Sequence, residues 1–117
     1  MNKKKQSINY LDLIPQRAET LRWHTDEATG LITLEVENTG VFNTIAQKVF
    51  HKPRTTQVHL DETGSYLWPL IDGQKTVAQL ADCMKQQFGK KAEPLYPRII
   101  KYFQIVESYH FIKFLNQ

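Results

Sequence analysis

The side chains most often used in catalysis and metal binding are scattered along this sequence. The four histidines, His24, His51, His59 and His110, fall in separate predicted elements, and none are three or four residues apart, as helical metal ligands are. Cys83 is the single cysteine, and no arrangement of histidine and asparagine is evident that would activate its thiol. We therefore expect no metal site and no catalytic cysteine.

Acidic pairs and glycines give no better candidate for chemistry. Asp26-Glu27 lies in a predicted turn and Asp61-Glu62 at a predicted helix start, where carboxylates favour the turn or interact with the helix dipole. The five glycines are dispersed and form no phosphate-binding loop. The sequence thus predicts a protein that is not an enzyme, with no catalytic residues and no cofactor.

The composition is that of one small globular domain. Of the 117 residues, 41% are hydrophobic and 23% charged, and no apolar run reaches the length of about 20 residues that crosses a bilayer. The basic start lacks the apolar stretch of a signal peptide, and a single cysteine fits a reducing compartment, so we expect a cytoplasmic protein. Lys3, Lys4 and Lys5 account for the net charge of +3, which leaves a neutral body and disfavours nucleic acid as a partner.

Residues 1–19 are predicted to be a mobile basic segment, and residues 20–117 a single domain. Alternation of apolar and polar residues and punctuation by turn residues indicate strands in the first half of the domain. A stripe at helical spacing indicates one short extra helix, which Pro53 ends. The strands are predicted over 20–25, 31–37 and 55–60, and the helix over 42–50.

The second half of the domain reads as three helices and a terminal strand over 110–115. Asp61 is a predicted N-cap, and Pro69 should kink or end the helix that it starts. Thr76 and Gln79 have the spacing of a capping box, and Gly89 ends that helix. The last helix begins near Pro94. The predicted fold is α+β, a winged helix-turn-helix arrangement in which a small antiparallel sheet of about three strands packs against three main helices.

The stretch from Val58 to about Leu115 resembles the PqqD family, whose members are also called RiPP precursor-peptide recognition elements. The resemblance is carried by a helix start, a tryptophan, an Asp-Gly turn and a second helix start. These are Leu60-Asp61-Glu62-Thr63-Gly64, Trp68, Leu70-Ile71-Asp72-Gly73 and Thr76-Val77-Ala78-Gln79-Leu80.

The resemblance implies a peptide-binding adaptor. Such domains hold the leader segment of a ribosomally made precursor peptide and present it to a modifying enzyme, often a radical S-adenosylmethionine protein. The leader would add as a strand to the sheet edge and pack against the last helix. The receiving edge would be Thr56, Gln57, Val58 and His59, and proline at Val58 would weaken binding if its N–H faces outward. The helix would supply Arg98 and Lys101 for acidic residues and Tyr102, Phe103 and Val106 as apolar anchors.

Other interpretations of the same residues stay open. Each apolar residue of the last helix could equally belong to the core, because a helix needs a buried stripe to be stable. A winged-helix nucleic-acid-binding protein is one alternative, with Lys48, Lys52 and Arg54 beside His51 as its best basic patch. A subunit-interaction domain is another, since an open strand edge can also pair with a second copy and form a homodimer.

Overall fold

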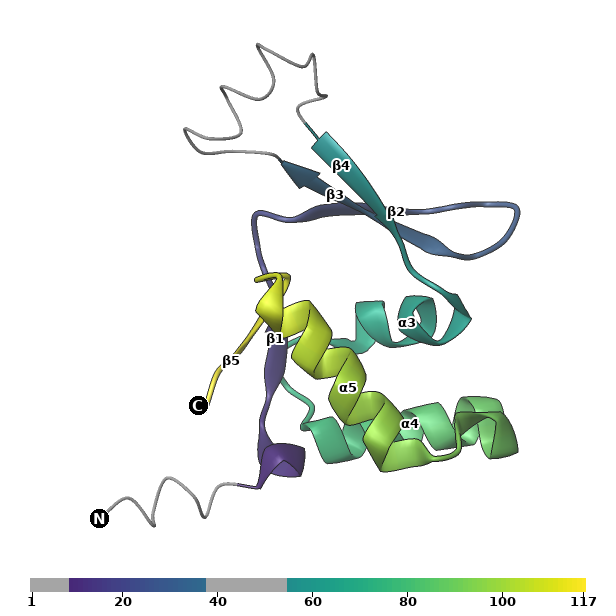
Figure 1. Ribbon diagram of the computed structural model, residues 1–117, viewed down its shortest axis with the longest axis vertical. Helices are drawn as coiled ribbons and strands as arrows, with labels where there is room; N and C mark the ends of the chain where they lie inside the picture. Colours follow the sequence, from purple (N-terminus) through teal and green to yellow (C-terminus); the bar gives the residue numbers. More distant parts are fainter. Residues whose placement is uncertain (1–8, 38–54) are drawn as a thin grey trace.

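A computed structural model describes residues 9–37 and 55–117 of the chain and confirms the α+β class (Figure 1). The predicted helix over 42–50, and with it Lys48, His51, Lys52 and Arg54, lies outside these residues. The strands are β1 (Pro15–Arg17), β2 (Arg22–Thr25), β3 (Ile32–Glu37), β4 (Thr55–His59) and β5 (Ile112–Phe114). The helices are α3 (Glu62–Leu67), α4 (Val77–Phe88) and α5 (Leu95–Ser108), with 3-10 turns η1 (Tyr10–Asp12), η2 (Trp68–Leu70) and η3 (Gly89–Ala92). None of the helices in the described ranges has the length and apolar character needed to span a bilayer.

The predicted three-stranded sheet is antiparallel, with the strand order β2-β3-β4. The side chains of β3 alternate between the two faces of the sheet, as the sequence predicts. Ile32 and Leu34 are buried against the helices, whereas Glu35 lies on the opposite face. On that second face His24 Nδ1 and Glu35 Oε2 are 3.0 Å apart. The sheet therefore has one face in the core and one polar face.

The helix boundaries lie where the capping residues predict them. Asp61 Oδ1 accepts a hydrogen bond from the Gly64 N–H at 2.8 Å, and Thr76 and Gln79 form both hydrogen bonds of the capping box. Pro69 falls in η2, where α3 has ended. Gly89, with φ of 59°, ends α4 in a positive-φ conformation that glycine adopts without steric cost.

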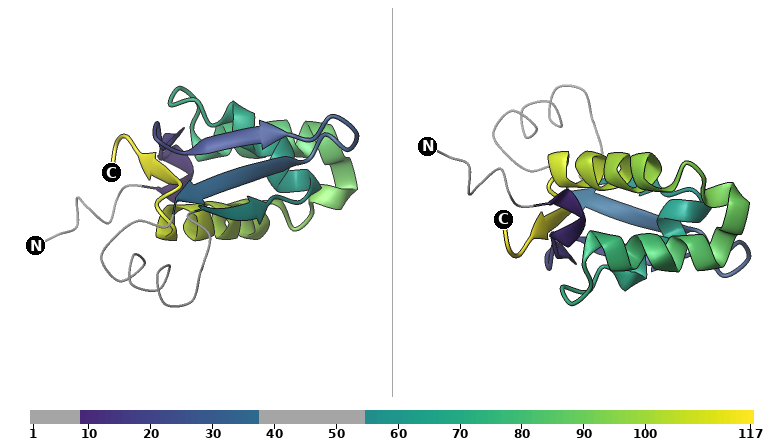
Figure 2. Two further views of the ribbon diagram at one scale, coloured as in Figure 1. Left: turned by 90° about the horizontal axis from the view of Figure 1, so that it is seen from above. Right: turned by 90° about the horizontal axis from the view of Figure 1, so that it is seen from below.

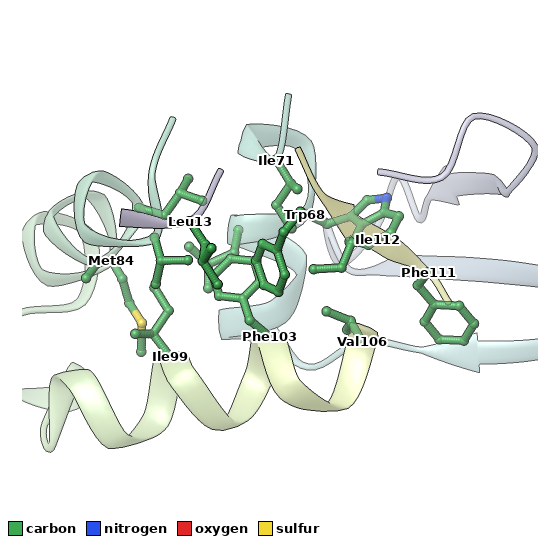
Figure 3. Packing of buried hydrophobic residues seen from close by; sticks show 14 of the residues in the cluster. Leu13, Trp68, Ile71, Met84, Ile99, Phe103, Val106, Phe111 and Ile112 are labelled. Carbon is green, nitrogen blue, oxygen red and sulfur yellow. The ribbon is translucent and has the colours of Figure 1, made fainter. Parts of the chain in front are cut away.

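The core lies between the sheet and the three helices (Figure 3). Trp68 and Phe103 are its largest fully buried side chains, and Trp23 of β2 packs edge-to-face on Trp68 with ring centroids 6.5 Å apart. Figure 3 shows Phe103 and Val106 pointing from α5 toward Trp68 and Ile112. The apolar stripe of α5 is thus used mainly to hold the helix on the body of the protein.

The prediction of a mobile segment over 1–19 is wrong for residues 9–19, while residues 1–8 lie outside the described part. β1 pairs with the predicted C-terminal strand, β5, in a second antiparallel sheet. Leu13 and Pro15 are buried, so this segment contributes to the core. Arg17 donates hydrogen bonds to the carbonyl oxygens of Trp68, Pro69 and Ile71 at 2.9–3.2 Å, which ties β1 to the end of η2.

A buried serine joins the sheet to α3. The Ile32 N–H donates to Ser65 Oγ at 2.8 Å, and the Ser65 hydroxyl donates to the Leu60 carbonyl at 3.3 Å. The hydroxyl therefore replaces a direct backbone bond at the end of the ladder, where the Leu60 N–H still donates to the Ile32 carbonyl at 2.9 Å. Ser65 thus helps to fix the position of β4 relative to α3.

Replacing Ser65 with alanine should lower the free energy of unfolding by about 1–3 kcal/mol, because the buried Ile32 N–H and the partly buried Leu60 carbonyl lose their partner. Ser108→Ala is the matched control, since that exposed hydroxyl bonds the Ile105 carbonyl within its own helix and its loss should cost little. Urea denaturation of both variants measures the difference. Equal stabilities would show that the Ser65 bridge is energetically unimportant.

Ionisation of Tyr10 should lower the stability of the protein at alkaline pH. Burial, with a smaller contribution from the charge of Glu107, raises the pKa of Tyr10 to about 12, and its buried hydroxyl has no hydrogen-bond partner among residues 9–37 and 55–117. A raised pKa adds stability that is fully present below the unfolded value of about 10 and is lost as the pH rises toward 12. Tyr10→Phe should therefore reduce the stability loss between these pH values, whereas Tyr109→Phe, at an exposed position, should not. Parallel loss in all three proteins would contradict this assignment.

Candidate functional site

β4 is an edge strand of the described sheet, because its one strand partner there is β3. Antiparallel pairs alternate in hydrogen bonding, and the bond from Leu60 to Ile32 sets the phase. The backbone of Val58 accordingly faces β3, and that of Gln57 and His59 faces the opposite side. The condition that the Val58 N–H faces outward is therefore not met, so proline there would break the protein's own ladder.

The side chains of β4 lie on both faces of the sheet. Val58 pairs with Leu34 on the core face and is partly buried. Gln57 and His59 lie on the polar face, where His59 Nδ1 is 2.9 Å from the Thr33 hydroxyl. In β4, therefore, the apolar side chain of Val58 faces the core, and the outward backbone groups belong to the polar residues Gln57 and His59.

A cavity of about 260 Å³ lies where β4 ends, between the start of α3 and the first half of α5. We call it the α3–α5 cavity. Figure 2 shows β4 as the strand on the α5 side of the sheet and β2 on the other side. The cavity wall is mostly apolar, with charged groups at its rim. It is lined by Asp61, Thr63, Gly64, Leu67, Met84, Arg98, Ile99, Lys101, Tyr102 and Ile105.

Gly64 and Tyr102 bring the two walls of the cavity together. The Tyr102 hydroxyl donates to the Gly64 carbonyl at 3.3 Å, and a Cβ on Gly64 would lie 3.2 Å from Tyr102 Cε1. Glycine at this position thus lets the ring lie close against α3. Burial, with a smaller contribution from Asp61, raises the pKa of the Tyr102 hydroxyl, so it stays neutral at ordinary pH.

The charged residues at the rim are Asp61, Arg98 and Lys101, so the rim has a positive net charge. Arg98 and Lys101 are exposed, and neither takes part in the two ion pairs found within 9–37 and 55–117. The carboxylate of Asp61 accepts the Gly64 N–H as a helix cap, so its charge is partly satisfied within α3. The rim can therefore attract a negatively charged group beside an apolar wall.

The structure brings most of the predicted contact residues together, but not all of them. Thr56, Gln57, Val58 and His59 form β4, and Arg98, Lys101 and Tyr102 line the α3–α5 cavity. Phe103 and Val106 belong to the core instead, with exposed fractions of 0% and 4%, and so present almost no surface to a ligand. Ile105, which we did not predict as a contact, lines the cavity and is 46% exposed.

His24, His59, His110 and Cys83 lie in separate segments of the described part of the chain, and His51 lies outside that part. No group of three or more His, Cys, Asp and Glu side chains is placed there to hold a metal ion. His110 follows α5, and Cys83 is a partly buried residue of α4.

The comparisons with known proteins give one match. A family model described as coenzyme PQQ synthesis protein D (PqqD) matches residues 48–112, more than half of the 117 residues. The matched range includes β4, all three helices of the described part and the first residue of β5, and hence both the strand edge and the cavity. No match was found among curated proteins or among solved structures. The chain therefore belongs to the PqqD family, and this membership supports an accessory role in the modification of a peptide.

Proposed function

We propose that the protein is a non-catalytic adaptor that holds the leader segment of a ribosomally made precursor peptide as an added strand on β4. The observation that carries this proposal is that Gln57 and His59 turn their backbone groups outward on the strand that leads, through Leu60, to Asp61 in the lining of the α3–α5 cavity. Such an edge can pair with any extended chain, whereas a neighbouring cavity can select among side chains.

Useful binding affinity requires both the β4 edge and the α3–α5 cavity. Gln57 and His59 together offer two N–H donors and two carbonyl acceptors, and each bond contributes a net free energy of about 1 kcal/mol. A sum of about 4 kcal/mol corresponds to a dissociation constant near 1 mM, before the entropy cost of association. Burying one large apolar side chain adds about 1.5–3 kcal/mol. Useful affinity and selectivity therefore depend on filling the cavity.

These features define the peptide that the site should prefer. It would form a β-strand, place a large apolar side chain against Ile105 and the half-buried ring of Tyr102, and carry an acidic residue near Arg98 or Lys101. The partner in the same process would be a cytoplasmic modifying enzyme, with a radical S-adenosylmethionine protein as the class that the family resemblance implies. Phe103 and Val106 are left out of the contact set because they are buried.

Amide chemical-shift mapping tests the proposal. The ¹⁵N-labelled protein would be titrated with a precursor peptide encoded beside its gene. We expect the largest shifts at Gln57, His59 and the residues from Lys101 to Ile105. No shifts at millimolar peptide, or shifts confined to β2, would contradict the proposal.

Two controls separate the alternatives. Concentration-dependent shifts at Gln57 and His59 without peptide would indicate that β4 pairs with a second copy of the chain. Duplex DNA that shifted α5 with an affinity falling steeply as salt rises would favour the nucleic-acid alternative.

A further inference from the structure

A cluster of exposed cations continues from the rim of the α3–α5 cavity. Arg98 and Lys101 lie on the first half of α5, and Lys90 and Lys91 lie on η3, which joins α4 to α5 at one end of the helix pair (Figure 2). We call these four residues the cationic corner. Glu93 is the one acidic residue in the sequence between Lys90 and Lys101, so the segment has a net charge of +4 − 1 = +3.

In residues 9–37 and 55–117, none of the four cations of the cationic corner forms an ion pair. Within the part of the chain that the structure describes, the ion pairs are His24–Glu35 and Lys75–Asp72. The Arg98 guanidinium donates a hydrogen bond to the Lys91 carbonyl, so α5 is joined to η3 at this corner. Arg98 thus links the lysines of η3 to the cavity that it lines.

We propose that the cationic corner binds an acidic stretch of the same peptide, beyond the segment that pairs with β4; this inference rests on the proposed function. Asp61, two residues past the end of β4, lines the cavity together with Arg98, and Arg98 is bonded to η3, so a peptide strand continued past His59 would run toward the cationic corner. The peptide class is therefore an apolar strand-forming segment joined to several aspartate or glutamate residues on the side that leaves past the end of β4.

The small size of the cationic corner and the apolar cavity beside it favour an acidic peptide over nucleic acid as the ligand. Four cations interrupted by Glu93 form a short patch, whereas a duplex-binding surface commonly neutralises 6–10 phosphates. The patch also adjoins an apolar cavity, which a phosphate backbone would leave empty but a peptide side chain can fill. Carboxylates presented along an extended chain match both features.

The test uses synthetic octaglutamate as the probe and octaglutamine as its uncharged counterpart. At low salt, octaglutamate should shift the amides of Lys90, Lys91 and Arg98, and octaglutamine should not. The double variant Lys90→Gln/Lys91→Gln should weaken octaglutamate binding about fivefold. The control Arg22→Gln/Lys113→Gln removes the same charge from exposed positions on the two sheets and should leave binding unchanged.

The outcomes separate this inference from the proposed function. Equal weakening in both double variants would overturn it, because the interaction would then follow net charge alone. Tighter binding of duplex DNA than of octaglutamate to the same lysines would also overturn it. A precursor peptide that shifts β4 while octaglutamate leaves the corner unaffected would refute the corner but not the strand edge.

Discussion

Gln57→Pro is expected to weaken binding of the precursor peptide by about a hundredfold. Proline removes the outward N–H of Gln57, so a carbonyl of the added strand loses its donor, at a cost of about 1–3 kcal/mol. The proline ring also occupies space along the edge where the peptide backbone must approach. The protein's own ladder should survive, because the bonds to β3 come from the alternate residues of β4.

Thr25→Pro is the matched control for this variant. Thr25 lies on β2 at the opposite edge of the same sheet, and the bond from the Asp26 N–H to the Leu31 carbonyl places its own N–H outward. Calorimetric titration should give unchanged affinity for this control, and thermal unfolding should show similar stability for both proline variants. Full peptide affinity in a folded Gln57→Pro protein would rule out β4 as the receiving edge.

Ile105→Asp should weaken peptide binding by about thirtyfold, with little change in stability. Ile105 is 46% exposed and lines the α3–α5 cavity, so the free protein can hydrate a carboxylate at this position. A bound apolar side chain would displace that water and leave the carboxylate without a partner, at a cost of about 2 kcal/mol. An acidic peptide would also be repelled by the new charge.

Leu31→Asp provides the control for the loss of an exposed apolar residue. Leu31 is 38% exposed and lies before β3, away from the cavity lining. Fluorescence anisotropy with a labelled precursor peptide should show native affinity for Leu31→Asp. Similar losses in both variants would mean that the aspartate acts through overall charge, and the cavity would lose its assigned role.

The parts of the fold that depend on neighbouring residues could be predicted from the sequence. Asp61, Thr76 and Gly89 mark helix ends through bonds and backbone angles within a few residues of themselves. β1 could not be predicted in this way. Its three residues show no apolar alternation, and they pair with β5, almost the whole chain length away.

The sequence predicts which strand and which helix form the candidate site, but not which of their side chains face a ligand. Periodicity identifies α5 as amphipathic, but it does not show which apolar residues face the core and which border a cavity. Phe103 and Val106 proved to be core residues, whereas Ile105 lines the cavity. The direction of the Val58 N–H likewise depends on the pairing of β4 with β3, which the sequence of one strand cannot specify.

Amide hydrogen exchange in the presence of saturating precursor peptide tests the pairing of a peptide with β4 most directly. We expect exchange at Gln57 and His59 to slow by at least about tenfold, because their N–H groups would become hydrogen-bonded. Trp23 and Thr25, whose N–H groups face outward on β2, should exchange at unchanged rates. Unchanged exchange at Gln57 and His59 with the peptide bound would contradict strand addition at β4.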